Sequence, residues 1–204
     1  MSYGTKWGPD GPPPEAYSRV TDAERFRPLH AAMREIIYRL QNDFDVALTE
    51  GYGLDEELER RLTLDAPSVR LTPSDSGAAP ITVVFTNFPG LHLRFGHWLI
   101  EPFPDCGCDA CDESAEGEIE NLTDMVDDVT AGRFREWVRI PMLSSAAWKG
   151  REKWADQTRL HERNTGTWSG GESRIDRREA RAITGGRRRM DFRWKPWARR
   201  QAGA

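Results

Sequence analysis

Apolar residues recur at helical spacing in two stretches of the chain. One stripe lies within residues 21–44 and consists of Leu29, Met33, Ile36, Ile37, Leu40 and Phe44. Such a stripe is typical of a helix that buries one side. Thr21 and Glu24 have the spacing of a capping box, and Pro28 suits the first turn of the helix, where a missing N–H costs nothing. A second stripe predicts another long helix over residues 113–131 and consists of Ile119, Leu122, Val126 and Val129.

Between these two helices the pattern changes to alternation. The alternating apolar positions are Val46 and Leu48, Val69 and Leu71, Ile81, Val83 and Phe85, Leu91, Leu93 and Phe95, and Trp98 and Ile100. Glycine and proline residues separate these runs, as in an antiparallel meander with one buried face. The charged run over residues 54–64 predicts a short helix between strands. Residues 134–140 predict one more strand, which Pro141 ends.

The fold class that follows is α+β, with a mostly antiparallel sheet of four to five strands and two long helices on one face. We expect three parts of the chain. Residues 1–16 are predicted to be a disordered lead-in, because glycine and proline dominate their second half. Residues 17–142 form the α+β domain. Residues 143–204 form an irregular basic tail, rich in Trp and Arg, that is either partly ordered or disordered.

The charge distribution separates the tail from the rest of the chain. The 204 residues have a formal net charge of −4, yet residues 149–204 hold 16 Lys and Arg against 7 Asp and Glu, and residues 1–148 hold 13 against 26. The acidic body should repel nucleic acid, whereas arginines interleaved with Trp194 and Trp197 suit a single strand. The alternative is intramolecular, with the basic tail folding back on the acidic body.

Missing motifs exclude several classes of protein. The sequence has no G-x-x-x-x-G-K-[S/T], G-x-S-x-G or H-E-x-x-H motif. It has no run of about 20 apolar residues that could cross a membrane, and its N-terminus lacks the apolar centre of a signal peptide. We therefore expect a soluble, cytoplasmic protein.

All three cysteines lie in one short segment, which reads Asp105-Cys106-Gly107-Cys108-Asp109-Ala110-Cys111-Asp112-Glu113. Thiols this close do not make a disulfide framework, and their thiolates repel one another unless a cation lies between them. Zinc is the usual cation, so Cys106, Cys108 and Cys111 are candidate zinc ligands. The fourth ligand has to come from elsewhere. His97 is our first candidate, and His92 and Asp109 are also close in sequence.

Two other interpretations of the cysteines stay open. They could be reduced thiols in a loop before a helix, with Gly107 allowing the turn, or they could form a redox centre. The redox interpretation is disfavoured, because no basic side chain lies between Arg94 and Arg133 to stabilise a thiolate.

Short motifs along the chain resemble those of a known family. They are residues 17–21, 24–26 and 28–30, residues 85–86 and 88–91, the cysteine segment 106–113, and residues 132–134. On these residues the chain resembles an uncharacterised family of small proteins from GC-rich actinobacteria, which is classed as a domain of unknown function. The resemblance covers roughly residues 16–140 and implies that they form one unit. It implies no catalytic residue.

These observations give three hypotheses for the function. The leading one is a non-enzymatic protein whose cysteine loop is structural and binds zinc. The second is a binding module that engages nucleic acid or an acidic protein through residues 174–200. The third is an enzyme of unknown class that uses the cysteine loop or the sheet face carrying His92 and Arg94.

Overall fold

The computed structural model of the chain describes residues 7–139, 154–162, 168–169, 172–176, 184–187 and 189–201. Its helices are the 3-10 helices η1 (Pro14–Ser18) and η2 (Ala23–Phe26), and α1 (Pro28–Asp43), α2 (Glu56–Glu59) and α3 (Ala115–Thr130). Its strands are β1 (Val46–Gly51), β2 (Ser68–Pro73), β3 (Ile81–Thr86), β4 (Gly90–Phe95), β5 (Leu99–Phe103), β6 (Phe134–Arg139), β7 (Trp154–Glu162), β8 (Trp168–Ser169), β9 (Glu172–Asp176) and β10 (Arg189–Arg193). None of the helices in these ranges is long and apolar enough to cross a membrane.

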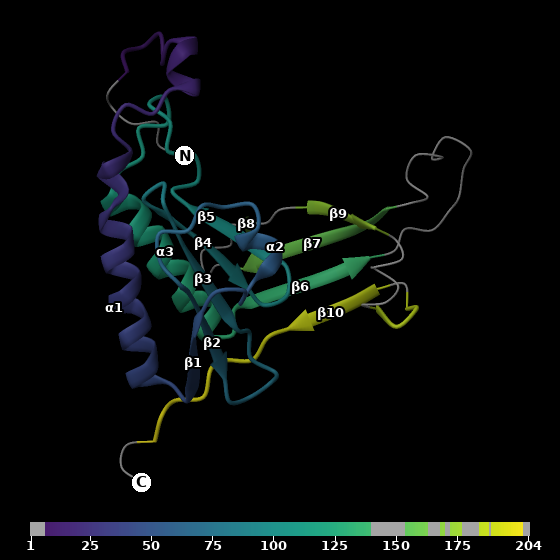
Figure 1. The fold of residues 1–204 in the computed structure, drawn as a ribbon. Coiled ribbons are helices and arrows are strands. Elements are labelled where there is room, and N and C mark those ends of the chain that lie inside the picture. The colour runs from purple at the N-terminus through teal and green to yellow at the C-terminus, as the bar shows by residue number, and fades with distance from the viewer. Residues whose placement is uncertain are drawn as a thin grey trace, which may run out of the picture.

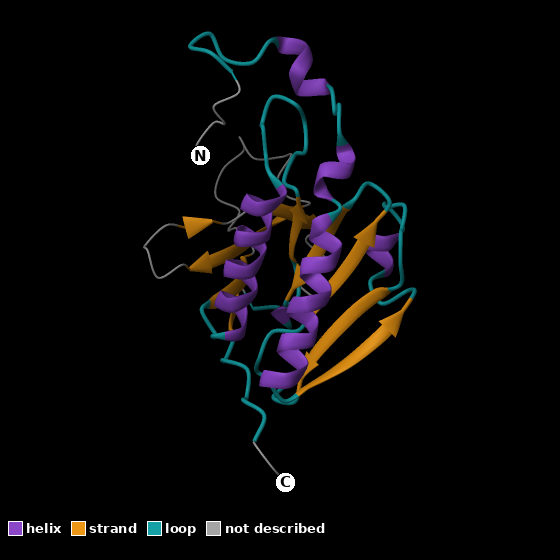
Figure 2. Cartoon of the chain, turned by 90° about the vertical axis from the view of Figure 1, so that its left-hand side faces the viewer, coloured by secondary structure: helices purple, strands orange, loops and turns teal. Residues whose placement is uncertain are grey.

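The central sheet has the order β1-β2-β3-β4-β5, and each neighbouring pair is antiparallel. Helices α1 and α3 contact each other and lie across one face of this sheet (Figure 2). The apolar stripes of both helices meet the inward side chains of the strands in one core, which includes Leu29, Met33, Phe85, Leu93 and Leu122. The predicted α+β fold, with two long helices on one face, is confirmed.

A second sheet is built on the last strand that the sequence predicts, β6. This strand pairs antiparallel with β10 on one side and β7 on the other, and β7 also pairs with β8 and β9. The sequence analysis did not predict β7–β10, because these segments contain few apolar residues at alternating positions. Strand β10, for example, offers only Met190 and Phe192 as an alternating pair. Residues 143–153 and 177–183 of the predicted tail lie outside the described residues.

The end of the chain returns to the central sheet and passes the ends of β1 and β2 (Figure 1). Trp194 and Trp197 are buried in the main core, and the Trp197 indole N–H donates to the carbonyl of Ala79 at 2.9 Å. Two ion pairs of this segment reach acids of the body, Lys195 to Asp75 at 3.0 Å and Arg199 to Asp43 at 3.3 Å. The described end of the basic tail therefore folds back on the acidic body, which is the intramolecular alternative.

The predicted capping box does not form at the first helix. Asp22 precedes η2 without a side-chain cap, and the Glu24 carboxylate pairs with Arg27 at 3.0 Å. Thr21 instead bonds to Asp109 through both its backbone N–H and its hydroxyl. The predicted helix is consequently split into η2 and α1, and α1 begins at Pro28 as expected.

Candidate metal centre

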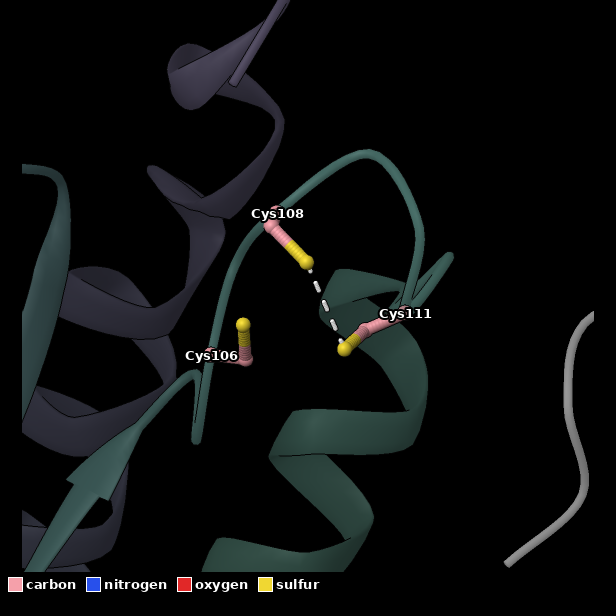
Figure 3. A group of neighbouring side chains, drawn as sticks. All are labelled: Cys106, Cys108 and Cys111. Carbon is pink, nitrogen blue, oxygen red and sulfur yellow. Dashed lines mark hydrogen bonds between the residues drawn. The ribbon is translucent and has the colours of Figure 1, made fainter. Parts of the chain in front are cut away.

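The cysteine loop, residues 104–114, connects the end of β5 to the start of α3. The Sγ atoms of Cys106, Cys108 and Cys111 all lie within 4.8 Å of one another, and they point toward a common centre (Figure 3). The Sγ atoms of Cys108 and Cys111 are 3.4 Å apart. Cys108 is buried and Cys106 is exposed. The structure thus brings together the three cysteines that the sequence predicts as ligands.

Backbone geometry bends this loop so that the sulfurs converge. Gly107 has φ +73° and Asp112 has φ +51°, values in the left-handed region that side chains with a Cβ disfavour. The Glu113 carboxylate accepts from the backbone N–H of Gly107 at 2.6 Å and of Cys106 at 3.3 Å. Ser114 then caps α3 by accepting from Gly117 N–H at 3.1 Å. The loop therefore carries its own polar support.

Asp109 ties the loop to the N-terminal segment that precedes α1. Its carboxylate accepts from Arg19 Nε at 2.9 Å, from Thr21 N–H at 2.8 Å and from the Thr21 hydroxyl at 2.5 Å. These hydrogen bonds, with the Thr21 hydroxyl contributing most, hold the pKa of Asp109 well below its usual range. Because three donors occupy this carboxylate and its oxygens lie outside the sulfur group, Asp109 anchors the loop and is not placed as a metal ligand.

The three thiols share hydrogen bonds that distinguish Cys108 from its neighbours. Burial disfavours the Cys108 thiolate, but hydrogen bonds from the Cys106 thiol and the Cys111 backbone N–H outweigh burial and lower the pKa of Cys108. The hydrogen bond between the Cys111 thiol and Cys108, together with burial, raises the pKa of Cys111 to about 12. The Cys108 sulfur thus accepts hydrogen bonds from the other two cysteines, as expected when clustered thiols share one negative charge.

The geometry of the three sulfurs fits a zinc ion. A tetrahedral zinc ion with Zn–S bonds of about 2.3 Å holds its sulfur ligands about 3.8 Å apart, and the three Sγ atoms lie within 4.8 Å of one another. Thiolates are also the soft ligands that zinc accepts in closed structural sites. Among the described residues, no histidine, aspartate or glutamate places a donor atom in the same group.

His97, the first candidate for the fourth ligand, lies beyond the opposite end of β5 from the cysteine loop. Its ring packs against the rings of Phe192 at 4.5 Å and Trp194 at 4.9 Å between centroids. Burial lowers the pKa of His97, which favours the neutral imidazole. The structure does not bring His97 together with the three cysteines.

A family model matches residues 1–201, a span that includes the cysteine loop. The chain belongs to the family of unknown function DUF6226. This match confirms the resemblance to a domain of unknown function and extends it beyond residues 16–140. No curated protein and no solved structure gives a significant match.

In this DUF6226 protein the two outward side chains of β4 have different surroundings. Arg94 forms an ion pair with Asp55, the N-cap residue of α2, and another with Glu57 at 3.1 Å. Its charge is therefore balanced within the fold. The His92 side chain has no hydrogen-bond partner among the described residues and lines a cavity together with Cys106. Burial lowers the pKa of His92.

The sequence analysis missed a buried carboxylate of this DUF6226 domain, Glu136 on β6. It accepts from the backbone N–H groups of His97 at 2.9 Å and Trp98 at 2.7 Å, and from Leu99 N–H and the Trp194 indole at 3.1 and 3.0 Å. The sequence does hold a signal for it. Glu136 stands between Phe134 and Val138 on the inward side of an alternating strand, where a charge needs partners.

Proposed function

We propose that Cys106, Cys108 and Cys111 bind a structural zinc ion, and that this ion fastens the N-terminal segment of a non-enzymatic protein to its α+β domain. The observation that carries the proposal is the convergence of the three sulfurs within 4.8 Å in one loop. Three soft ligands at this separation match the donor set of a structural zinc site.

The contacts of the loop explain what the ion would stabilise. The backbone N–H of Asp109 donates to the carbonyl of Arg19 at 2.8 Å, and that of Ala110 donates to the carbonyl of Ala16 at 3.2 Å. Ala16 also packs with Cys108 and Ala110 in a small cluster of its own, separate from the main core. So small an apolar cluster contributes little burial energy, so a cation that rigidifies the loop would stabilise the attached segment as well.

The surroundings of the thiols support a structural role over a catalytic one. Nucleophilic cysteines need a base or a positive group beside the sulfur. Among the described residues, no imidazole nitrogen joins the sulfur group, and the two arginines that reach the loop are bonded elsewhere, Arg19 to Asp109 and Arg25 to the carbonyl of Gly107.

Metal analysis tests the proposal. Full-length protein purified without chelator should contain close to one zinc per chain, and Cys108→Ser should lose most of it. Asp112→Asn serves as a control in the same loop, because asparagine tolerates the left-handed backbone of that position, and it should keep its zinc. Zinc below a tenth of an equivalent in the unmodified protein would contradict the proposal.

The fastening role has its own readout. Chelation of the zinc should speed tryptic cleavage after Arg19 about tenfold, which corresponds to a loss of about 1.4 kcal/mol of local stability. Cleavage after Arg200 is the internal control, because that residue bonds through its N–H to Asp43 at the other end of the molecule, at 2.9 Å, and its rate should not change. Equal acceleration at both sites would indicate general unfolding instead.

A second candidate is a binding module that engages nucleic acid or an acidic protein through residues 174–200. One observation favours it: the guanidinium groups of Arg135 and Arg189 lie 5.3 and 5.4 Å from the ring centroid of Trp137, on the strands β6 and β10. Arginine beside an aromatic ring suits a nucleobase. Against it, Trp194 and Trp197 are buried. A gel shift with single-stranded DNA, comparing the full chain with its Arg189→Ala variant at moderate salt, tests this candidate, since equal binding counts against it.

A further inference from the structure

A cavity of about 510 Å³ borders the cysteine loop. Its polar lining includes Thr63, Thr86, Asn87, His92, Asp105 and Cys106. Its apolar lining is made by Leu62, Phe88, Pro102 and Pro104, and a volume of this size is in the range of small-molecule sites. Cys106 belongs both to the sulfur group and to the wall of this cavity, so the cavity adjoins the proposed zinc site.

The zinc site needs one more ligand than the described part of the protein supplies. Zinc prefers four ligands, and the group of converging donor atoms contains only the three cysteine sulfurs. A position without a protein ligand is the mark of a zinc site that exchanges its fourth ligand.

The charge around this position selects the kind of donor. A zinc ion with three thiolates carries one net negative charge, and Asp105 adds a carboxylate to the cavity wall. Arg61 is the cationic side chain at the cavity, but its guanidinium lies 3.7 Å from the carboxylate of Glu57, which offsets its charge. An anionic ligand would therefore meet repulsion, whereas a neutral nitrogen donor would not.

His92 is a cavity residue whose ring is placed to contact such a ligand. It projects from β4, where its Cα pairs with that of Pro102 on β5, the strand that leads into the cysteine loop. The ring has no hydrogen-bond partner among the described residues, and an imidazole can donate to or accept from a bound heterocycle.

We propose, on the basis of the proposed zinc site, that its fourth coordination position opens into this cavity and takes a small neutral nitrogen donor of the imidazole type, which His92 contacts. The zinc ion would then both fasten the N-terminal segment and provide a metal-dependent binding position for a small molecule.

Cobalt substitution tests this proposal, because the visible bands of Co²⁺ report its ligands. The full-length protein, loaded with Co²⁺, is titrated with imidazole and, as the anionic counterpart, with acetate. Imidazole should shift the bands with saturation, and acetate should require at least ten times the concentration. His92→Ala should weaken imidazole binding at least threefold without changing the amount of bound Co²⁺. His97→Ala is the matched control and should change neither quantity.

The outcomes separate the two proposals. If the protein binds neither zinc nor cobalt, both are wrong. If cobalt binds at one equivalent and its bands ignore imidazole, the zinc site stands and the open position is disproved. If His92→Ala removes a nitrogen ligand from the cobalt spectrum before any imidazole is added, His92 itself completes the site, and the open position is again disproved.

Discussion

The two ends of β5 are fastened in different ways. At the start of the strand, Glu136 gathers the N–H groups of residues 97–99 and the indole of Trp194. At the other end, Asp109 gathers the donors of Arg19 and Thr21. Each carboxylate therefore holds one terminal segment of the chain against the domain, the C-terminal segment through Glu136 and the N-terminal segment through Asp109.

The difference lies in what surrounds the two carboxylates. Glu136 is fully buried within the main core, whereas the Asp109 loop has only Ala16, Cys108 and Ala110 as its buried apolar cluster. Burial raises the pKa of Glu136, while the Thr21 hydroxyl lowers that of Asp109. The Glu136 end is thus stabilised by hydrogen bonds inside the packed core, and the Asp109 end by hydrogen bonds beside a small apolar cluster and, as we propose, by a metal ion.

The largest effect is expected from Glu136→Ala. The substitution leaves three backbone N–H groups and the Trp194 indole without an acceptor, at a position with no exposed surface. We expect a loss of about 3–5 kcal/mol in the free energy of unfolding, measured by urea denaturation of the full chain. The control is Glu50→Ala on the exposed side of β1, which should stay within about 0.5 kcal/mol. A loss below about 1 kcal/mol at Glu136 would show that the strand end does not depend on this carboxylate.

A smaller, local effect is expected from Asp109→Asn. The amide keeps the shape of the side chain but turns one acceptor into a donor that faces Arg19 and Thr21. We expect tryptic cleavage after Arg19 to accelerate about tenfold, which corresponds to about 1.4 kcal/mol, while the urea midpoint of the domain changes little. A drop in the urea midpoint comparable with that of Glu136→Ala would mean that the two ends are equally important for the core.

The elements with strong patterns were predictable from sequence. The stripe from Leu29 to Leu40 and the alternation from Ile81 to Phe95 gave α1, β3 and β4, because burying one face requires that spacing. Strands β7–β10 were not predictable in this way, because they are fixed by pairing rather than by their own apolar residues. Strands β7 and β10 pair with β6, and β8 and β9 pair with β7. The Thr21 capping box was wrong because a distant residue, Asp109, outcompetes the local partner Glu24.

The candidate site was predictable in part for the same reason. Cys106, Cys108 and Cys111 are neighbours in sequence, so a single loop suffices to bring them together. The choice of His97 depended on closeness in sequence, and the extended strand β5 separates His97 from the loop. His92 lies farther away in sequence, yet the pairing of β4 with β5 places it at the same cavity as Cys106. The separation of two residues along the sequence does not reveal that β4 and β5 pair and bring them together.

The smallest effect concerns pH, and it distinguishes the two ends by sign. The folded-state pKa of Glu136 lies above its usual value of 4.5, so the folded protein binds this proton more tightly than the unfolded chain. Glu136 therefore contributes stability that is present below pH 4.5 and is lost as the pH rises through the folded-state pKa. Asp109 behaves oppositely, because its lowered pKa gives stability that is present above pH 3.8 and is lost on further acidification.

Urea midpoints at pH 5 and pH 7 measure the Glu136 contribution. Glu136→Gln has no proton to exchange, so the difference in stability between the unmodified protein and this variant should shift in favour of the unmodified protein on going from pH 7 to pH 5. Asp109→Asn should leave this shift unchanged, because Asp109 stays ionised at both pH values. If the shift is absent in Glu136→Gln comparisons, the four N–H donors compensate the buried charge fully, and the two ends of β5 do not differ in the sign of their pH dependence.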